Sequence, residues 1–495
     1  MKKYLFLGLI YFLAVVIQAQ IINGDILSVD GKKILKVWGT HYERGYAAGY
    51  FMGDKIKSLS ENYFIGTFFG GNAYLYENTK EYFLEFFEIE PKYHAETEGM
   101  IDGMIEADIV LFSNTLDRDI DENDILLANA IVDLSALRGL GVNYDFGCSS
   151  LSSWGDNTAG DLELQGDLVI TRNMDWTLHP ELLENHLLVV HFPSESNEVN
   201  WLSFTFPGFI GCLSGINENE LSAFMNMGNR NDHTNNYTYH PILLSIRNGI
   251  EVFDYNGDYE ITPDDILAAV EDNFQLSGSI IHAASNEGGL IIECNNQYGV
   301  VSRDDNDNTM LPLEHLAATN HFRELYPPVS CYRYENISDS LSVNPYITIE
   351  RSWNLMAAAA GVSTNLHTIQ YVPSLQLIKW STADLGSPAY QNEPTTFDLD
   401  DLFTSNASSD QHYIQQNSFL SATPNPFNTF TNLAFTLPRT SDVRLTVYNV
   451  KGHKITVLIN NVLYPGKHNV LWDGTDRNGN KVASGIYLSS ISPVL

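Results

Sequence analysis

The sequence predicts an α+β protein with a small all-β module at its carboxyl end. The chain has 495 residues, 44% of them hydrophobic, which is enough for a sizeable core in roughly two or three domains. Apolar residues recur with helical spacing up to residue 137, and from Cys148 onward the pattern changes to alternating strands. Beyond residue 418 the strands are short and separated by turns, as in a β-sandwich.

The charge of the chain restricts its partners. Acidic residues number 61 and basic residues 27, which gives a formal net charge of −34. Nucleic acids and anionic membrane surfaces bind basic patches, so we expect neither as a partner.

The first residues have the features of an export signal. Two lysines follow Met1, an apolar core follows them, and the small residue Ala19 ends the stretch. We therefore predict a secretory signal peptide over residues 1–19. The mature protein is expected to be secreted or held at the cell surface, with the periplasm as the alternative. No later apolar run has the length of a membrane span.

Residues 20–147 are predicted to be mainly helical. Residues 26–37 suggest a strand or two broken at Gly31, and a helical pattern begins after Gly39. Small side chains on this helix would let another backbone pack closely against it. They belong to Gly45, Ala48, Gly49 and Gly53.

The central feature of the sequence is Cys148, which follows Gly147 and opens an alternating run that predicts a half-buried strand. One interpretation is a small buried hydrophobe. The other is a nucleophile, which needs a thiolate and a base. No histidine stands nearby in the sequence. If the Gly147–Cys148 bond were cut, the new α-amino group, with a pKa of roughly 8, could accept the thiol proton.

Two residues of the next predicted strand could assist such a nucleophile. Arg172 would favour the thiolate, and Asp175 could orient the α-ammonium group. Successive side chains alternate between the two faces of a strand, so a strict strand would point these two residues in opposite directions. We therefore expect the chain to bend near Asn173.

The run Gly147-Cys-Ser-Ser followed by Thr171-Arg-Asn-Met-Asp-Trp resembles the penicillin acyltransferase-like (acyl-coenzyme A:6-aminopenicillanic acid acyltransferase) family of N-terminal-nucleophile cysteine hydrolases. Bile-salt hydrolases, penicillin V acylase and acid ceramidase are its relatives. The resemblance extends over residues 37–403. It implies an αββα four-layer sandwich, self-cleavage between Gly147 and Cys148, a small chain of residues 20–147 that stays bound, and a catalytic segment of residues 148–403.

The same resemblance implies further site residues. Asn320, in a Thr-Asn-His segment, would donate its side-chain amide to the oxyanion of the tetrahedral intermediate. Arg333 would be a second active-site arginine. Asn226, or its near neighbour Asn229, falls where the relatives carry an active-site Asn or Tyr; an ordinary strand-end asparagine is the alternative.

The pattern also predicts the strands of this segment. They are residues 161–172, 187–192, 201–206 and 290–294, and a closing hairpin of residues 368–372 and 375–380.

An acidic loop between these strands has the spacing of a calcium-binding loop. Oxygen ligands would occupy positions 1, 3, 5, 7, 9 and 12, with Tyr259 in place of the usual glycine. The alternative is an acidic turn that caps the helix beginning at Pro263. A bound calcium would be structural, and we expect no cofactor in catalysis. The six residues are Asp254, Asn256, Asp258, Glu260 through its carbonyl, Thr262 and Asp265.

After a polar linker of residues 404–417, residues 418–495 form the predicted all-β module. Pro424-Asn-Pro-Phe, Trp472-Asp-Gly and Ala483-Ser-Gly-Ile-Tyr resemble the immunoglobulin-like module that ends many exported Bacteroidetes-type proteins. Such modules often serve as type IX secretion signals, which implies the secretion machinery as a partner.

The sequence thus predicts a secreted, self-processing amidohydrolase. Its substrate would be a small acyl-amide with a linear C–N bond, and Cys148 would carry the acyl group. One alternative is an acyltransferase that moves this group to an amine. Another is a non-catalytic surface or carbohydrate-binding protein with an inactive core. If Cys148 is the nucleophile, the other three cysteines can form at most one disulfide.

Overall fold

The computed structural model divides the chain into two compact units, residues 22–404 and a carboxyl-terminal unit within residues 405–495. The predicted signal peptide and residues 405–417 of the predicted linker lie outside the described residues. The structure describes residues 22–135, 137, 147–230, 237–307, 310–404, 421–427, 429–437, 441–449, 454–463, 466–477, 479–483 and 485–493.

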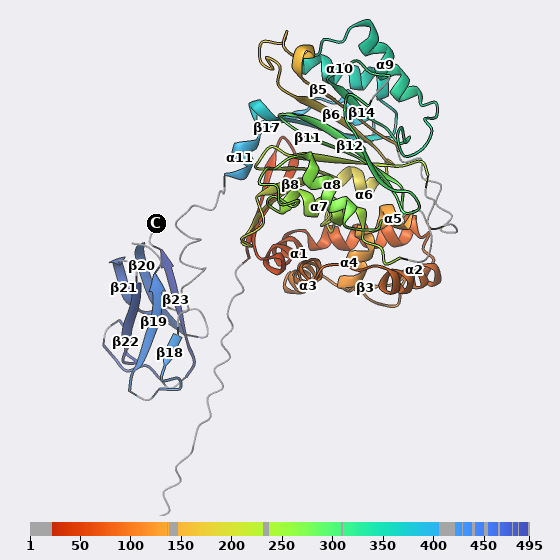
Figure 1. Ribbon diagram of the computed structural model, residues 1–495. Coiled ribbons are helices and arrows are strands. Elements are labelled where there is room, and N and C mark those ends of the chain that lie inside the picture. The colour runs from red at the N-terminus through yellow and green to blue at the C-terminus, as the bar shows by residue number, and fades with distance from the viewer. Residues whose placement is uncertain are drawn as a thin grey trace, which may run out of the picture. The chain divides into compact units, whose positions relative to one another are not determined.

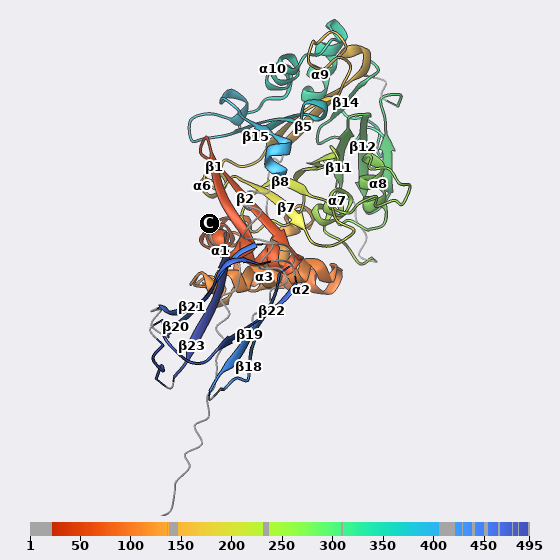
Figure 2. The same cartoon turned by 90° about the vertical axis from the view of Figure 1, so that its left-hand side faces the viewer.

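The larger unit has four layers, in the order helices, sheet, sheet, helices (Figure 1). Figure 2 shows α9 and α10 on one side of the sheets and α1, α2 and α3 on the other. The predicted αββα arrangement and the separate small all-β unit are therefore confirmed.

The first sheet has nine strands. Its neighbouring strands run antiparallel except for the parallel pair of the second and third members. In spatial order the strands are β1 (Gly24–Val29), β2 (Lys32–Gly39), β7 (Leu187–Pro193), β8 (Trp201–Thr205), β9 (Ser214–Asn217), β10 (Ser222–Met227), β11 (Ser279–Ser285), β12 (Gly288–Asn295) and β13 (Gly299–Arg303).

The second sheet has six antiparallel strands and carries Cys148. The strands nearest the site come from distant parts of the chain, which the antiparallel pairing brings together. In spatial order they are β14 (His315–Ala318), β5 (Gly147–Ser153), β6 (Val169–Asp175), β15 (Asn365–Val372), β16 (Leu377–Thr382) and β17 (Thr395–Asp398).

Helices cover the outer face of each sheet. On the first sheet, α1 packs on β2, α7 on β9 and α8 on β12; on the second, α9 packs on β14 and α10 on β6. The helices of the larger unit are α1 (His41–Ser58), the π-helix η1 (Leu59–Phe68), α2 (Ala73–Phe86), α3 (Pro91–Glu106), α4 (Glu122–Asn129), α5 (Ile131–Leu134), α6 (Pro180–Glu184), α7 (Ile242–Glu251), α8 (Pro263–Glu271), α9 (Tyr332–Val343), α10 (Ile349–Ala360) and α11 (Leu399–Phe403). Short 3-10 turns η2 (Gly155–Asn157), η3 (Pro373–Leu375) and η4 (Ala389–Gln391) and the two-stranded ribbon β3 (Phe112–Ser113) and β4 (Arg118–Asp119) complete it.

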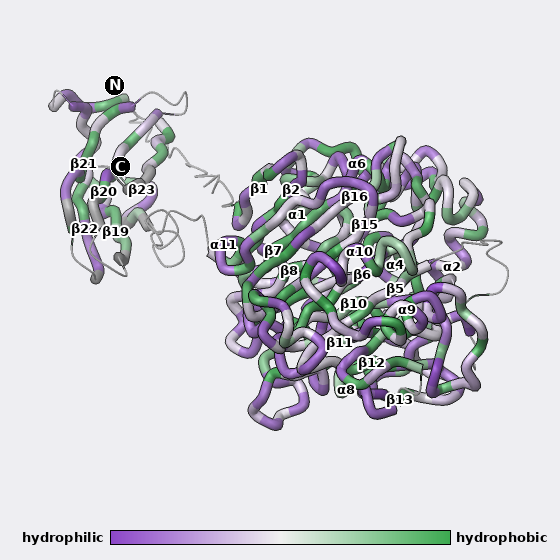
Figure 3. Tube along the Cα trace, turned by 90° about the horizontal axis from the view of Figure 1, so that it is seen from above, coloured by the Kyte–Doolittle hydropathy of each residue, from purple (hydrophilic) through white to green (hydrophobic). Residues whose placement is uncertain are grey.

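The inner faces of the two sheets share one hydrophobic core. Period-two alternation brings Leu188, Phe204 and Phe224 of the first sheet against Ile369 and Trp380 of the second. Figure 3 shows this hydrophobic character along β7 and β8. This core therefore fixes the distance between the two sheets, and Cys148 lies between them.

Helices α1 and α3 pack backbone to backbone. A Cβ atom added at Gly45 would lie 1.8 Å from the Glu96 carbonyl oxygen, and one at Gly49 would lie 1.9 Å from that of Met100. Only glycine permits this approach. The close packing expected from the sequence is thus present, and α3 is the partner.

One predicted strand differs from the structure. Residues 161–168 form turns, and β6 begins only at Val169. The Asp161 carboxylate accepts hydrogen bonds from the backbone N–H groups of Glu163 and Leu164 at 2.8 and 3.1 Å, and Gly166 has a φ of +107°. Because local side-chain bonds satisfy this backbone, the apolar alternation does not produce a strand there.

The carboxyl-terminal unit has two three-stranded sheets. Leu433, Val443, Val447 and Trp472 form its core. One sheet consists of β18 (Ser421–Thr423), β19 (Thr431–Leu437) and β22 (Gly466–Trp472), and the other of β21 (Lys454–Leu463), β20 (Ser441–Asn449) and β23 (Tyr487–Pro493).

Within the described ranges, the helices lack the length and apolar character that a bilayer crossing requires.

Candidate active site

Cys148 lies on β5, on the face that the second sheet turns toward the first. It pairs with Met174 of β6, and its side chain is 4% exposed. The neighbouring inward-facing side chains of β5, Ser150 and Ser152, both contact His282 of β11 at 2.8 Å. The thiol is therefore buried between the two sheets.

Arg172 reaches the sulfur from the neighbouring strand. Its Nη2 atom lies 3.7 Å from Cys148 Sγ and donates to the Met225 carbonyl oxygen at 2.8 Å. Its Nη1 atom lies 2.9 Å from His367 Nε2. These contacts bring the predicted thiolate-stabilising charge to the thiol.

The bend expected near Asn173 is absent, because β6 continues as an unbroken strand through this residue. The Asp175 carboxylate therefore lies on the face of β6 opposite to Arg172, beside Gly147. It pairs with Arg333 Nη1 at 2.9 Å and accepts a bond from Asn365 Nδ2 at 3.1 Å. Burial raises the pKa of Asp175 to about 6, although Arg333 acts to lower it.

Asn320 and Arg333 contact the backbone of Cys148. The Cys148 N–H donates to Asn320 Oδ1 at 2.7 Å, and Arg333 Nη1 donates to the Cys148 carbonyl oxygen at 3.0 Å. Arg333 Nη2 also donates to Asn320 Oδ1 at 2.5 Å. A cut before Cys148 would therefore place the new amino group beside Asn320 Oδ1.

The amide nitrogen of Asn320 already makes one hydrogen bond. It donates to the Met227 carbonyl oxygen at 2.8 Å. An amide NH₂ group has two hydrogens, and the second has no hydrogen-bond partner among the described residues, so it could bind an oxyanion.

Gly147 lies against the charged side of the site. A Cβ atom added there would lie 3.1 Å from Arg333 Nη1 and 3.1 Å from Asp175 Oδ2. A side chain before Cys148 would thus crowd the ion pair that holds the Cys148 carbonyl.

In the uncut chain, burial favours the protonated form of the Cys148 thiol. Burial raises the pKa of Cys148, which the positive charge of Arg172 opposes. The Asp175 charge raises this pKa as well, whereas a hydrogen bond from the Asp175 backbone lowers it. Arg172 is therefore the largest influence in favour of the thiolate.

Asn226, within the part of the chain that the structure describes, forms no hydrogen bond to the residues around Cys148. It follows Met225, whose carbonyl binds Arg172, and its Nδ2 atom donates to the Ile280 carbonyl oxygen at 3.3 Å. Its buried Oδ1 atom has no hydrogen-bond partner among the described residues. Asn229, the other candidate from the sequence, lies after the end of β10.

Two polar residues of β15 belong to the site and were not predicted. Asn365 binds Asp175, and His367 binds Arg172. A bulge between them makes this possible, since Asn365 pairs with Asp175 while His367 pairs with Met174. Their strand was predicted only from residue 368, and their pairing with β6 across about 190 positions left no local signal in the sequence.

Comparisons with known proteins give one family model and several solved structures. Residues 427–493 match the model of the FlgD Ig-like domain. An N-acylethanolamine-hydrolyzing acid amidase ortholog from Caenorhabditis elegans is 15% identical, covers 50% of this chain and 100% of its own, and has a TM-score of 0.36. No curated protein matches the sequence.

Two further solved structures are similar to the chain at comparable levels. A mutant conjugated bile acid hydrolase from Clostridium perfringens is 10% identical, covers 51% of this chain and 93% of its own, and has a TM-score of 0.33. Penicillin V acylase from Agrobacterium tumefaciens is 16% identical, covers 48% and 83%, and has a TM-score of 0.28.

All four cysteines are buried free thiols, namely Cys148, Cys212, Cys294 and Cys331.

The predicted calcium loop has a mixed fit to the ion. Asp254 Oδ2 accepts the Tyr259 N–H at 3.0 Å, and the buried Asp254 Oδ1 atom has no hydrogen-bond partner among the described residues. Asp265, at position 12, instead binds the N–H groups of Asn256 and Thr262 at 3.1 and 2.9 Å and completes the N-terminal cap of α8. Calcium binding therefore stays a prediction, and the capping role is present in the structure.

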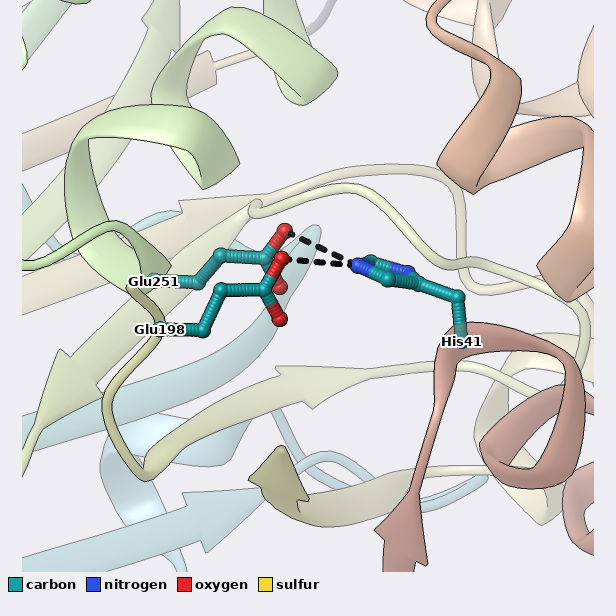
Figure 4. A group of neighbouring side chains, drawn as sticks. All are labelled: His41, Glu198 and Glu251. Atoms are coloured by element: carbon teal, nitrogen blue, oxygen red, sulfur yellow. Dashed lines mark hydrogen bonds and ion pairs between the residues drawn. The ribbon is translucent and has the colours of Figure 1, made fainter. Parts of the chain in front are cut away.

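A second polar cluster lies away from Cys148 and includes three side chains that could hold a metal ion (Figure 4). Glu198 Oε1 and Glu251 Oε1 lie 2.9 and 3.7 Å from His41 Nε2. Lys92 Nζ, however, lies 2.8 Å from Glu251 Oε1 and 3.4 Å from Glu198 Oε1. Because its ammonium already supplies a cation to both carboxylates, the geometry favours an ion-pair cluster.

Arginines complete this buried charge cluster. Arg247 Nη2 pairs with Glu96 at 2.8 Å, and its Nε atom pairs with Glu251 at 2.8 Å. Arg44 Nη2 pairs with Glu198 at 3.0 Å. We call His41, Arg44, Lys92, Glu96, Glu198, Arg247 and Glu251 the buried charge cluster.

The cluster should make stability depend on pH. Burial acts against ionisation, but the neighbouring cations hold the pKa values of Glu96, Glu198 and Glu251 below their usual range. The contribution of these carboxylates to the free energy of unfolding is therefore complete above about pH 4.5 and is lost as the pH falls. Burial lowers the pKa of His41, but hydrogen bonds to Glu198 and Glu96 outweigh it and raise the pKa overall. The contribution of His41 to the free energy of unfolding is complete below about pH 6.5 and is lost as the pH rises through its raised pKa.

We expect the difference in urea midpoint between wild type and His41→Gln to be larger at pH 6 than at pH 9. The matched control is His94→Gln, which replaces an exposed histidine and should change the midpoint little. An equal difference at both pH values would contradict the ionised state of His41.

Proposed function

We propose that the protein is an amide hydrolase that cuts its own chain between Gly147 and Cys148. It then uses Cys148 as an amino-terminal nucleophile on a small linear acyl-amide. The observation that carries the proposal is the convergence of Arg172 on the Cys148 sulfur and of Asn320 and Arg333 on its backbone.

Each contact supports a step of the reaction. After the cut, the α-amino group of Cys148 takes the thiol proton, and Arg172 stabilises the resulting thiolate. The sulfur attacks the substrate carbonyl, and the free N–H of Asn320 donates to the oxyanion. The α-ammonium group returns its proton to the leaving amine.

Water then attacks the thioester on Cys148 and releases the acid, with the α-amine as the base. An amine in place of water would give the acyltransferase, and the same residues would serve that reaction. The proposal also includes export: the predicted signal peptide would direct the chain to the secretion pathway, and the secretion machinery would recognise the carboxyl-terminal unit.

Intact mass of purified wild type and Cys148→Ala tests the self-cleavage. Wild type is expected to yield two chains, the second beginning at Cys148, whereas the variant yields one. Cys294→Ala, which removes another buried thiol, should process like wild type. Processed wild type is then expected to release acid from a panel of N-acyl amides.

A single uncut chain from both wild type and Cys148→Ala would contradict the proposal. The non-catalytic alternative would then gain support.

A further inference from the structure

The surroundings of Arg172 are unusual for a buried arginine. Its hydrogen-bond partners are a thiol, a backbone carbonyl and an imidazole, and the ion pairs formed by the described residues do not include it. Burial lowers the pKa of this guanidinium, whereas Cys148 and Asp175, and to a smaller extent Cys212, raise it. Arg172 thus carries a positive charge that no carboxylate among the described residues neutralises by direct contact.

His367 holds this charge without cancelling it. A hydrogen bond from Arg172 Nη1 requires a lone pair on His367 Nε2, so the imidazole is neutral and its proton is on Nδ1. Burial, followed by the charges of Arg172, His186 and Lys32, keeps the pKa of His367 well below its usual value. A carboxylate in this position would pair with the guanidinium and compete with the Cys148 thiolate.

The bulge in β15 gives His367 its place. The register moves from Asn365 opposite Asp175 to His367 opposite Met174, so the strand skips Leu366. As a result, one strand supplies the partner of Asp175 and the partner of Arg172, although those two residues point to opposite faces of β6.

We propose that His367 is the positioning residue of the site: a neutral acceptor that aims Arg172 at the Cys148 sulfur and leaves its positive charge to the thiolate. The inference rests on the proposed function, because it assigns the thiolate to Cys148.

The test measures the pH dependence of Cys148 alkylation by iodoacetamide, followed by mass analysis of the peptide that contains Cys148. His367→Leu removes the acceptor, and we expect its alkylation midpoint to rise by about one pH unit, with a roughly tenfold slower reaction at pH 7. His367→Gln keeps an uncharged acceptor and should stay within about threefold of wild type.

His367→Glu tests whether the site needs an uncharged acceptor or whether any hydrogen-bond acceptor beside Arg172 suffices. It keeps an acceptor but adds a negative charge, so its midpoint should rise at least as far as that of His367→Leu. The matched control is His315→Gln, which alters another buried histidine, bound to Ser153 at 2.7 Å, and should leave the midpoint unchanged.

Urea unfolding of each variant shows whether it folds. If His367→Leu does not fold, the inference is tested by comparing the alkylation midpoints of His367→Gln and His367→Glu. A midpoint in folded His367→Leu or His367→Glu equal to that of wild type would overturn the inference. Unfolding of all three variants would overturn it too, because it would assign His367 to the stability of the sheet. Failure of the proposed function gives a different result, an uncut wild-type chain, and the alkylation profiles can be measured on that chain as well.

Discussion

Replacing Arg172 with Leu should remove most of the reactivity of Cys148. The guanidinium lies 3.7 Å from the sulfur, and both side chains are buried. The loss of one such electrostatic contact costs about 2.7–4 kcal/mol of transition-state stabilisation, or a factor of about 100–1,000 in rate. Iodoacetamide alkylation of Cys148 and hydrolysis of an N-acyl amide, both at pH 7, should fall together.

Two variants control this experiment. Arg172→Lys keeps a positive charge but cannot bind Sγ, the Met225 carbonyl and His367 with one planar group, so an intermediate rate is expected. Arg351→Leu changes a partly exposed arginine on α10 and should react like wild type. Unchanged alkylation in folded Arg172→Leu would exclude Arg172 as the thiolate partner.

Replacing Arg247 with Leu should strongly destabilise the larger unit. This side chain is fully buried, pairs with Glu96 and Glu251, and packs 5.0 Å from the ring centre of Trp201. Its removal leaves two buried carboxylates short of positive charge, and breaking a buried ion pair in this way costs about 3–5 kcal/mol. The measurement is the urea midpoint followed by tryptophan fluorescence.

The matched control for Arg247 is Lys55→Leu. Lys55 is 38% exposed and lies 3.4 Å from Asp54, so its loss should cost less than about 1 kcal/mol. A second comparison adds Glu96→Gln and Glu251→Gln to Arg247→Leu, which removes the stranded charges and should restore part of the stability. Equal midpoints for Arg247→Leu and Lys55→Leu would contradict the electrostatic role of the cluster.

Local patterns predicted the strands that carry the nucleophile. The alternation around Cys148 gave β5, and the Arg172 to Asp175 motif lies on β6, its neighbour in the sheet. The helical spacing before residue 137 likewise anticipated the close packing at Gly45. These signals are local because period-two and period-3.6 patterns record which face of an element is buried.

The features of the site that the sequence did not predict depend on contacts between distant parts of the chain. The bulge that places His367 beside Arg172 arises only when β15 meets β6. Asp175 was expected to orient the α-ammonium group, and its ion-pair partner in the structure, Arg333, comes from a helix 158 positions away. The acidic and basic members of the buried charge cluster are equally dispersed, so no window of the sequence shows that they balance one another.

The buried charge cluster also has a consequence for the order of maturation. His41, Arg44, Lys92 and Glu96 precede the proposed cut, and Glu198, Arg247 and Glu251 follow it. Cations are in excess in the first group and carboxylates in the second, so neither group could be buried alone without stranding charge. If the chain were cut before it folded, the two pieces would have to associate by diffusion and would lose translational freedom. A continuous chain brings both groups of charges together without that loss. The proposed cut would therefore leave the buried charge cluster balanced only if it followed folding.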